Sequence, residues 1–226
     1  NTIKTATPSI SGEKITINGL SISEARSLIR NKLKYTKEDF IFIFIGRLVN
    51  DKGLRELADA MKMIEDGKMS IKLLLIGELD GEDDALKKEK LDYLMHSKNI
   101  TYLGVQADIR PYLLISDVLV FPSYREGFPN VPIEAGALGL PAIVTNINGS
   151  NEIIKEGVNG TIIQAPLDKN GNLVNDITNE LYTTMLWFYH HPEECKRMGE
   201  NAITLVREHY EQKDVWKALL EMYNSL

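Results

Sequence analysis

The chain of 226 residues carries a formal net charge of −6, and 43% of its residues are hydrophobic while 26% are charged. This composition is typical of a globular protein and excludes extensive disorder, and the negative charge argues against a general nucleic-acid-binding surface, which needs a cationic stripe. Cys195 is the only cysteine, so no disulfide can form within the chain and a cytoplasmic location is expected. No apolar run approaches the roughly 20 residues that a membrane-spanning helix needs.

Residues 1–39 are mostly polar and are interpreted as an N-terminal segment that carries one short helix. Apolar side chains at helical spacing predict this helix over residues 23–33. Neither Ser23 nor Ser27 completes a clean capping box, so the first residue of the helix stays open.

A regular alternation of apolar strands and amphipathic helices begins at Phe40. The expected strands are residues 40–45, 71–76, 100–103, 118–121, 142–145 and 160–163. The expected helices are residues 54–65, 85–96 and 109–115, one that starts at 132, and three closing helices over 174–189, 192–208 and 212–223. Short connections between these elements predict an α/β fold, a doubly wound Rossmann-like parallel sheet with additional C-terminal helices. Ligands of such sheets gather at the carboxyl ends of the strands.

The segment from Asp117 to Glu134 is the most informative stretch and is interpreted as strand, loop and helix. An apolar strand ends before Pro122, and a loop rich in Gly, Pro and Asn follows. Pro132 is expected at the first helical position, because its missing N–H would be unpaired there, and Val131 is then held outside the helical region. Glu134 would lie in the first turn, beside free N–H groups that suit an anionic ligand.

Glu126 and Glu134, separated by seven residues, are candidate ligand-binding carboxylates. They suit a polyhydroxylated ligand, because an ionised carboxylate can accept hydrogen bonds from two hydroxyl groups at once. The alternative is that Glu126 is an exposed loop acid and that Glu134 compensates the helix dipole. Spacing by itself leaves both interpretations open.

Arg47 and Lys52 form a basic pair beside the carboxyl end of the first long strand. The planar fork of arginine and the point charge of lysine could together neutralise a diphosphate. The alternative is two solvated cations near a helix start. Gly46, Gly77 and Gly104 end three strands, as a close backbone approach would require, although glycine is also common in ordinary turns.

Several other site types lack a sequence basis. The chain contains no Gly-x-Gly-x-x-Gly, no Walker-type Gly-x4-Gly-Lys and no Asp-x-Asp pair, which argues against dinucleotide, P-loop and Asp-x-Asp metal sites. His190, His191 and Cys195 are interpreted as an exposed helix junction rather than as a metal site.

The run Glu126-Gly-Phe-Pro-Asn-Val-Pro-Ile-Glu134 resembles the Glu-x7-Glu signature of retaining glycosyltransferases with the GT-B fold, most closely glycosyltransferase family 4. Residues 116–123 before it and 135–144 after it continue the resemblance. The run from Gly46 to Gly53, Gly-Arg-Leu-Val-Asn-Asp-Lys-Gly, resembles the Gly-Arg-Leu-x-x-x-Lys-Gly loop of the same family.

The resemblance implies roles for these residues. Arg47 and Lys52 would contact the diphosphate of a nucleotide-sugar donor, Glu126 would hold hydroxyls of the transferred sugar, and Glu134 would hold those of the ribose. Arg47, Lys52 and Glu126 are therefore the catalytic candidates. Further donor-binding candidates would border the base or face the sugar and phosphates, and these are Gly46, Gly104, Val105, Gln106, Gly127, Phe128, Pro129, Asn130 and Val131.

By the same resemblance, residues 1–39 include an interdomain connection, residues 40–210 form the donor-binding domain, and residues 211–226 form a closing helix. The acceptor site would belong to an N-terminal domain outside this sequence, so the chain alone is expected to lack transfer activity. Any membrane association of the whole enzyme is expected to occur through that domain.

The implied function is that of a retaining hexosyltransferase in polysaccharide biosynthesis. It would move a sugar from a nucleotide diphosphate sugar to a glycan or lipid-linked saccharide without a metal or other cofactor. Two alternatives stay open, a nucleotide-sugar-binding module without transfer activity and a GT-B epimerase or phosphorylase, because fold alone does not separate them.

Overall fold

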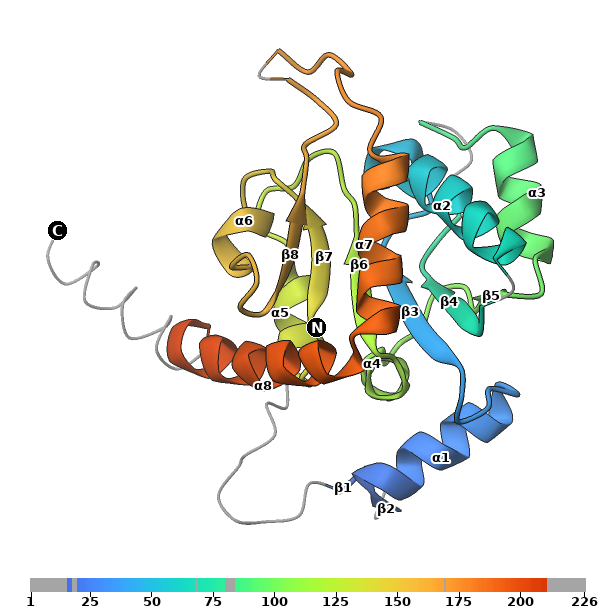
Figure 1. Cartoon of the computed structure of the whole chain (residues 1–226), viewed down its shortest axis with the longest axis vertical. Helices are drawn as coiled ribbons and strands as arrows, with labels where there is room; N and C mark the ends of the chain where they lie inside the picture. The colour runs from blue at the N-terminus through green and yellow to red at the C-terminus, as the bar shows by residue number, and fades with distance from the viewer. Residues whose placement is uncertain (1–15, 18–19, 68, 80–83, 169, 211–226) are drawn as a thin grey trace, which may run out of the picture.

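The structure, a computed structural model, describes residues 16–17, 20–67, 69–79, 84–168 and 170–210. A parallel sheet of six strands forms its centre, in the order β5-β4-β3-β6-β7-β8 (Figure 1). The doubly wound α/β fold expected from the sequence is confirmed. The strands are β3 (Phe40–Ile45), β4 (Ile71–Ile76), β5 (Ile100–Tyr102), β6 (Val118–Phe121), β7 (Ala142–Thr145) and β8 (Gly160–Ile163).

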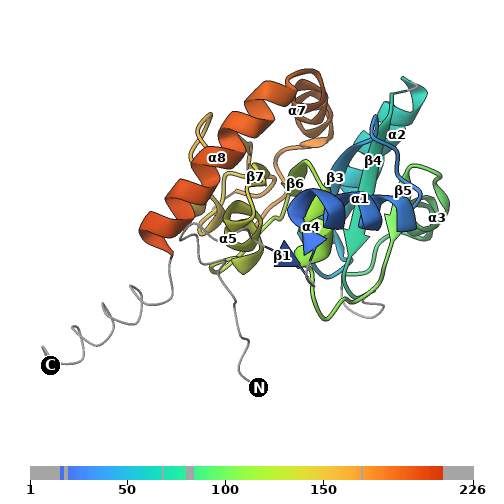
Figure 2. The same cartoon turned by 90° about the horizontal axis from the view of Figure 1, so that it is seen from below.

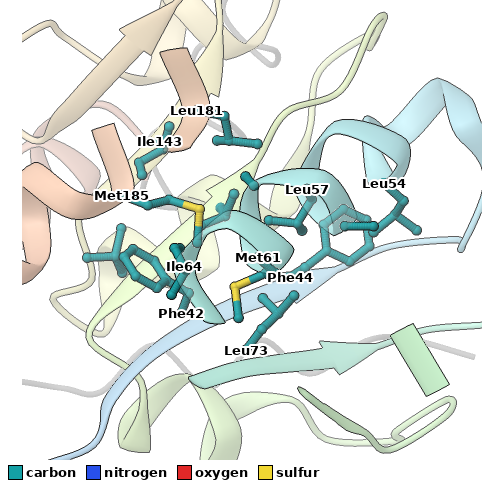
Figure 3. Close-up of a cluster of buried hydrophobic side chains, with 14 of the residues drawn as sticks. Phe42, Phe44, Leu54, Leu57, Met61, Ile64, Leu73, Ile143, Leu181 and Met185 are labelled. Atoms are coloured by element: carbon teal, nitrogen blue, oxygen red, sulfur yellow. The ribbon is translucent and has the colours of Figure 1, made fainter. Parts of the chain in front are cut away.

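Helices cover both faces of the sheet, and successive residues of each strand alternate between the two cores. The helices are α1 (Ile22–Lys32), α2 (Leu54–Asp66), α3 (Lys88–His96), α4 (Arg110–Ile115), α5 (Asn130–Ala137), α6 (Ser150–Ile153), α7 (Thr178–His190) and α8 (Pro192–His209). Phe42 and Phe44 point into the core under α2, α3 and α7, part of which is drawn in Figure 3. Ile41 and Ile43 point into the core under α4, α5 and α6. Helix α8 contacts both α5 and α7 and passes the amino-terminal ends of the strands (Figure 1).

Some boundaries differ from those expected. Helix α7 begins at Thr178 rather than at residue 174, because Asp176 Oδ1 accepts a hydrogen bond from the Thr178 N–H at 2.9 Å and sets the helix start there. Helix α3 begins at Lys88 rather than at residue 85. Helix α6 and the short antiparallel pair β1 (Thr16–Ile17) and β2 (Leu20–Ser21) are too short to produce a periodic pattern. The helix expected over 212–223 lies outside the described residues.

Helix α1 has a capping box that the sequence reading missed. Ser21 Oγ accepts a hydrogen bond from the Glu24 N–H at 3.3 Å, and Glu24 Oε2 accepts one from the Ser21 N–H at 2.9 Å. The helix therefore starts one residue earlier than expected, because Ser21, and not Ser23, is the N-cap.

Two arginines of α1 tie this helix to the amino-terminal edge of the sheet, where α1 lies beside α4 (Figure 2). Arg26 Nη2 lies 2.6 Å from Asp117 Oδ1, and Arg30 Nη2 lies 3.1 Å from Asp117 Oδ2. The same Oδ2 accepts a hydrogen bond from the Ile41 N–H at 2.8 Å. Arg30 is buried and also donates to the carbonyl oxygens of Thr36, Asp39 and Ile115. Asp117 thus joins α1, β3 and β6.

The segment before α2 approaches the segment after β6 closely at one glycine. Gly53 has a φ of 71°, in the left-handed region, and a Cβ built on it would lie 2.1 Å from the carbonyl oxygen of Pro122. Glycine is required here for both reasons, because it tolerates the dihedral angle and leaves room for the neighbouring backbone.

We expect Asp117→Ala to lower the free energy of unfolding by about 3 kcal/mol, because it leaves the buried Arg30 charge without its counter-ion. Asp108→Ala is a matched control that removes an exposed ion pair with Arg110, and it should cost less than about 1 kcal/mol. Urea unfolding of both variants measures the difference. Equal losses would contradict a role for Asp117 as the anchor of α1.

We expect Gly53→Ala to lower the free energy of unfolding by about 3 kcal/mol or more, because backbone strain and a clash with Pro122 add together. Gly171 also has a positive φ, of 82°, but nothing lies within 4 Å of a Cβ built there. Gly171→Ala should therefore show the strain alone, roughly 1–2 kcal/mol. Thermal and urea unfolding of the two variants would separate strain from clash.

Candidate functional site

The candidate site lies where the direction of strand addition reverses. From β3 the sheet grows through β4 to β5 on one side and through β6 to β8 on the other. The carboxyl ends of β3 and β6 therefore border the switch point at which ligands of doubly wound sheets bind. The loop after β3 includes the 3-10 turn η1 (Asn50–Lys52), and the loop after β6 covers residues 122–129.

Lys52 and Glu126, predicted from separate parts of the sequence, meet at this edge. Lys52 Nζ lies 2.5 Å from Glu126 Oε1, and the side chains are 18% and 14% exposed. Such limited exposure strengthens the attraction between the two charges relative to a pair on the open surface. Within the described part of the chain, no hydrogen bond to the other oxygen, Oε2, is formed, so this atom can accept one from a ligand hydroxyl.

Ser123 is a residue of this site that the sequence reading did not single out. Its buried hydroxyl donates to Glu126 Oε1 at 2.8 Å, while its own carbonyl oxygen accepts a hydrogen bond from the Thr145 hydroxyl. Glu126 is thus held by a serine from its own loop and a lysine from the other. The only sequence signal was the position of Ser123 after Pro122, inside the run that resembles the glycosyltransferase signature.

Arg47 lies at an exposed position directly after Gly46, at the end of β3. The Gly46 N–H donates to the carbonyl oxygen of Ile76 at 3.0 Å, and this extends the pairing of β3 with β4 by one residue. Arg47 therefore lies at the same edge of the sheet as Lys52 and Glu126.

Backbone at the ends of β4 and β5 is packed tightly. A Cβ on Gly77, whose φ is 146°, would lie 1.8 Å from the carbonyl oxygen of Gly46, and the Gly77 N–H donates to that of Gly104 at 3.0 Å. Gln106 is held within the protein, because its amide nitrogen donates to Leu103 and its amide oxygen accepts from Tyr112. Val105 beside it is 71% exposed and available as an apolar surface for a ligand.

Helix α5 begins two residues earlier than expected, so two predictions about it are wrong. Asn130 is its first residue and Val131 is helical, which places Pro132 at the third position. Proline is tolerated there because the first four N–H groups of a helix have no partner within it. Glu134 consequently lies past the first turn. It is half-buried, and burial raises the pKa of its carboxyl group.

The segment from Gly127 to Pro129 is the last part of the loop between β6 and α5. A Cβ on Gly149 would lie 2.5 Å from the carbonyl oxygen of Gly127, so the loop rests directly on the start of α6. Phe128 is 51% exposed, and its ring centroid lies 6.0 Å from that of Tyr210. The predicted residues of this segment therefore line the same sheet edge as Glu126.

A cavity of about 710 Å³ lies elsewhere, at the amino-terminal edge of β3 and β6. None of the predicted site residues lines it. Its arginines, Arg26 and Arg30, are already bound to Asp117 and to backbone carbonyl groups. The carboxyl-terminal edge, which borders the switch point of the sheet and holds the Lys52–Glu126 pair, is the better candidate for a ligand site.

The described residues offer neither a metal site nor a membrane span. No group of three or more His, Cys, Asp or Glu side chains there is arranged to hold a metal ion. Cys195 is buried, and burial raises the pKa of its thiol to about 12. No helix in the described ranges combines the length and the apolar character needed to cross a lipid bilayer.

Comparison with known proteins identifies several related glycosyltransferases. The chain is 32% identical over 227 residues to the capsular polysaccharide biosynthesis glycosyltransferase CapM of Staphylococcus aureus, covering 94% of this chain and 56% of that protein. It is 28% identical over 184 residues to the UDP-Gal:alpha-D-GlcNAc-diphosphoundecaprenol alpha-1,3-galactosyltransferase of Escherichia coli, covering 80% and 46%. The chain spans about half the length of these relatives.

The fold is that of a solved structure, Anabaena HepE in complex with UDP-glucose. The two superpose with a TM-score of 0.76 at 22% sequence identity, over 90% of this chain and 53% of that one. The sequence profile of the family described as Glycosyl transferases group 1 matches residues 25–205. This match covers most of the chain, from α1 to α8, and the chain therefore belongs to the group 1 glycosyl transferases.

Proposed function

We propose that this chain is the donor-binding part of a retaining hexosyltransferase. It holds a nucleotide diphosphate sugar, from which the whole enzyme transfers the sugar to a glycan or lipid-linked saccharide. The observation that carries the proposal is the contact of Lys52 with Glu126 at the switch point of the sheet. The UDP-glucose complex of HepE and the polysaccharide role in the name of CapM support this class of donor and pathway.

The charges of the site suit departure of a diphosphate. When the bond between the sugar and the diphosphate breaks, negative charge grows on the leaving oxygen, and Arg47 and Lys52 would stabilise it. Cationic groups held in place before the reaction need no reorganisation at that moment, which makes them effective catalysts. We therefore propose that the reaction needs no divalent cation.

The carboxylates would bind the neutral part of the donor. Glu126 has one oxygen engaged by Lys52 and Ser123 and the other available for sugar hydroxyls. Glu134, half-buried on α5, would accept hydrogen bonds from the ribose. The remaining predicted residues, Gly46, Gly104 to Gln106 and Gly127 to Val131, would line the donor along the same edge.

The acceptor would be bound by a part of the enzyme that this chain does not include, as its share of the relatives' length suggests. The single cysteine is buried and reduced, which fits a cytoplasmic site of action. Assaying the whole enzyme for transfer, donor hydrolysis and epimerisation tests the proposal. Epimerisation or hydrolysis of the donor without any transfer would contradict the proposal.

We expect the chain to bind UDP or GDP in the presence of a metal chelator, because Arg47 and Lys52 supply the positive charge. Free ligand at about 100 times its dissociation constant should raise the free energy of unfolding by roughly 2.7 kcal/mol. Calorimetry and thermal shift with EDTA or with Mg²⁺ measure the effect. Binding of UDP and GDP only when Mg²⁺ or Mn²⁺ is added would contradict metal independence.

We expect Glu126 and Glu134 to affect different ligands. Glu134→Ala should weaken binding of both UDP and UDP-glucose, since both carry the ribose. Glu126→Ala should not weaken UDP binding, because it frees Lys52 from its ion pair, and it should weaken UDP-glucose by about 1.5–3 kcal/mol, the worth of a hydrogen bond to a charged group. Titrating each variant with both ligands measures this, and equal losses at Glu126 for the two ligands would remove it from the sugar site.

The raised pKa of Glu134 adds a pH dependence to this prediction. Burial favours the protonated form, so Glu134 contributes stability at low pH that is lost as the pH rises through its raised pKa. Ribose binding has the opposite trend, because it needs the ionised carboxylate. Glu134→Gln should therefore leave the chain at least as stable at pH 7 while weakening UDP binding.

A further inference from the structure

Glu56, in the first turn of α2, is a buried acid that the proposed reaction does not use. Its side chain is 0% exposed. Glu56 Oε1 accepts hydrogen bonds from Arg55 Nε at 2.9 Å and from the Tyr124 hydroxyl at 2.5 Å, whereas its Oε2 is buried without a partner in the described residues. Glu56 is ion-paired with Arg55, but a buried carboxylate oxygen without a partner is costly, and a role beyond packing would account for its presence.

Tyr124 connects this carboxylate to the candidate site. Its N–H donates to the carbonyl oxygen of Asp51 at 2.7 Å, and its hydroxyl donates to Glu56. Burial, and secondly the hydrogen bond to Glu56, raise the pKa of the phenol, so the hydroxyl stays protonated as a donor. Tyr124 lies one residue after Ser123 and two before Glu126. The loop that carries the sugar-facing carboxylate is therefore attached to α2 through this phenol.

The hydrogen bond from Tyr124 to Glu56 constrains Glu126 and Lys52 differently. Lys52 precedes α2 directly, and hydrogen bonds from the Gly53 N–H to Asn50 and from the Leu57 N–H to Gly53 fix its turn to the helix. Glu126 belongs to a loop between β6 and α5. Ser123 and Arg125 of this loop bond to Asp51 in the turn before α2, and the Tyr124 hydroxyl bonds the loop to α2 itself. Loss of the phenol hydroxyl should thus displace Glu126 and leave Lys52 in place.

We propose that Glu56 and Tyr124 are positioning residues, which hold the loop of Ser123 and Glu126 against α2 so that the Glu126 carboxylate meets the sugar of the donor. The assignment rests on the proposed function in taking Glu126 as the sugar-binding group. The anchoring of the loop itself rests only on the observed hydrogen bonds.

The test uses Tyr124→Phe, which removes the hydroxyl and keeps the ring, together with Glu56→Gln. Tyr93→Phe, a half-buried tyrosine on α3, and Glu65→Gln, which loses a carboxylate that accepts a hydrogen bond from Ser97 at the far end of α2, are matched controls. Amide hydrogen exchange of residues 122–127 is measured without ligand. Affinities for UDP-glucose and UDP are then measured by calorimetry.

We expect faster exchange of residues 122–127 in Tyr124→Phe, with exchange in β3 and β6 unchanged. The increase should be smaller in Glu56→Gln, because the amide oxygen can still accept a weaker hydrogen bond from the phenol. Affinity for UDP-glucose should fall roughly tenfold in Tyr124→Phe, as loss of one hydrogen bond to a charged group can produce. Affinity for UDP should change less than about twofold, since Lys52 keeps its place, and the control variants should match the wild type.

Two results would overturn the assignment. One is wild-type exchange of residues 122–127 in Tyr124→Phe, which would show that the hydroxyl does not anchor the loop. The other is faster exchange with unchanged selectivity for UDP-glucose over UDP. A wild-type chain that binds neither ligand would count against the proposed function, and the exchange measurement would still decide whether Tyr124 anchors the loop.

Discussion

The parallel pairing of β3 with β6 is the constraint on which the site depends. These strands are far apart in the sequence, yet Phe42 pairs with Val118 and Ile43 with Leu119. Both faces of these strands are buried, so a shift by one residue would move each apolar side chain from its own core to the core on the opposite face. This register places the ends of the two strands level, so that the loops carrying Lys52 and Glu126 leave the sheet side by side.

Asp117 and Gly53 maintain this pairing from opposite edges of the sheet. At the amino-terminal edge, the Asp117 N–H donates to Ile41 and its carboxylate accepts from the Ile41 N–H, while two arginines of α1 neutralise its charge. At the carboxyl-terminal edge, Gly53 allows the backbone before α2 to touch Pro122. The first contact lies at the edge away from the functional loops, whereas the second brings these two loops together.

Several charged side chains at the carboxyl-terminal edge of the sheet are partly or fully shielded from water. Lys52 and Glu126 are mostly shielded from solvent, Glu56 is fully buried, and Glu134 is desolvated enough for its pKa to rise. Groups of this kind cost free energy unless a partner or a ligand compensates them. A site that binds a charged donor benefits from this arrangement, because its electrostatic interactions are strengthened when water is excluded.

The sequence by itself determined most of the sheet and the identity of its signature loops. The strands 40–45, 71–76, 118–121, 142–145 and 160–163 were predicted with their observed bounds, and the central ones among them are recognisable because a strand buried on both faces is a nearly continuous apolar run. The Arg47 to Gly53 loop and the run from Glu126 to Glu134 were recognisable as local motifs. Their placement at one sheet edge followed from the fold class.

Only the tertiary structure decided which side chains meet there. Ser123 donates a hydrogen bond to Glu126, and Tyr124 donates one to Glu56. No local sequence pattern predicts these two bonds, because they form in buried surroundings. The start of α5 at Asn130 likewise differed from the local preference of Pro132, because a proline fits any of the first four positions, where helical N–H groups lack partners. Local propensity describes a residue's own backbone, whereas these contacts depend on what packing brings beside it.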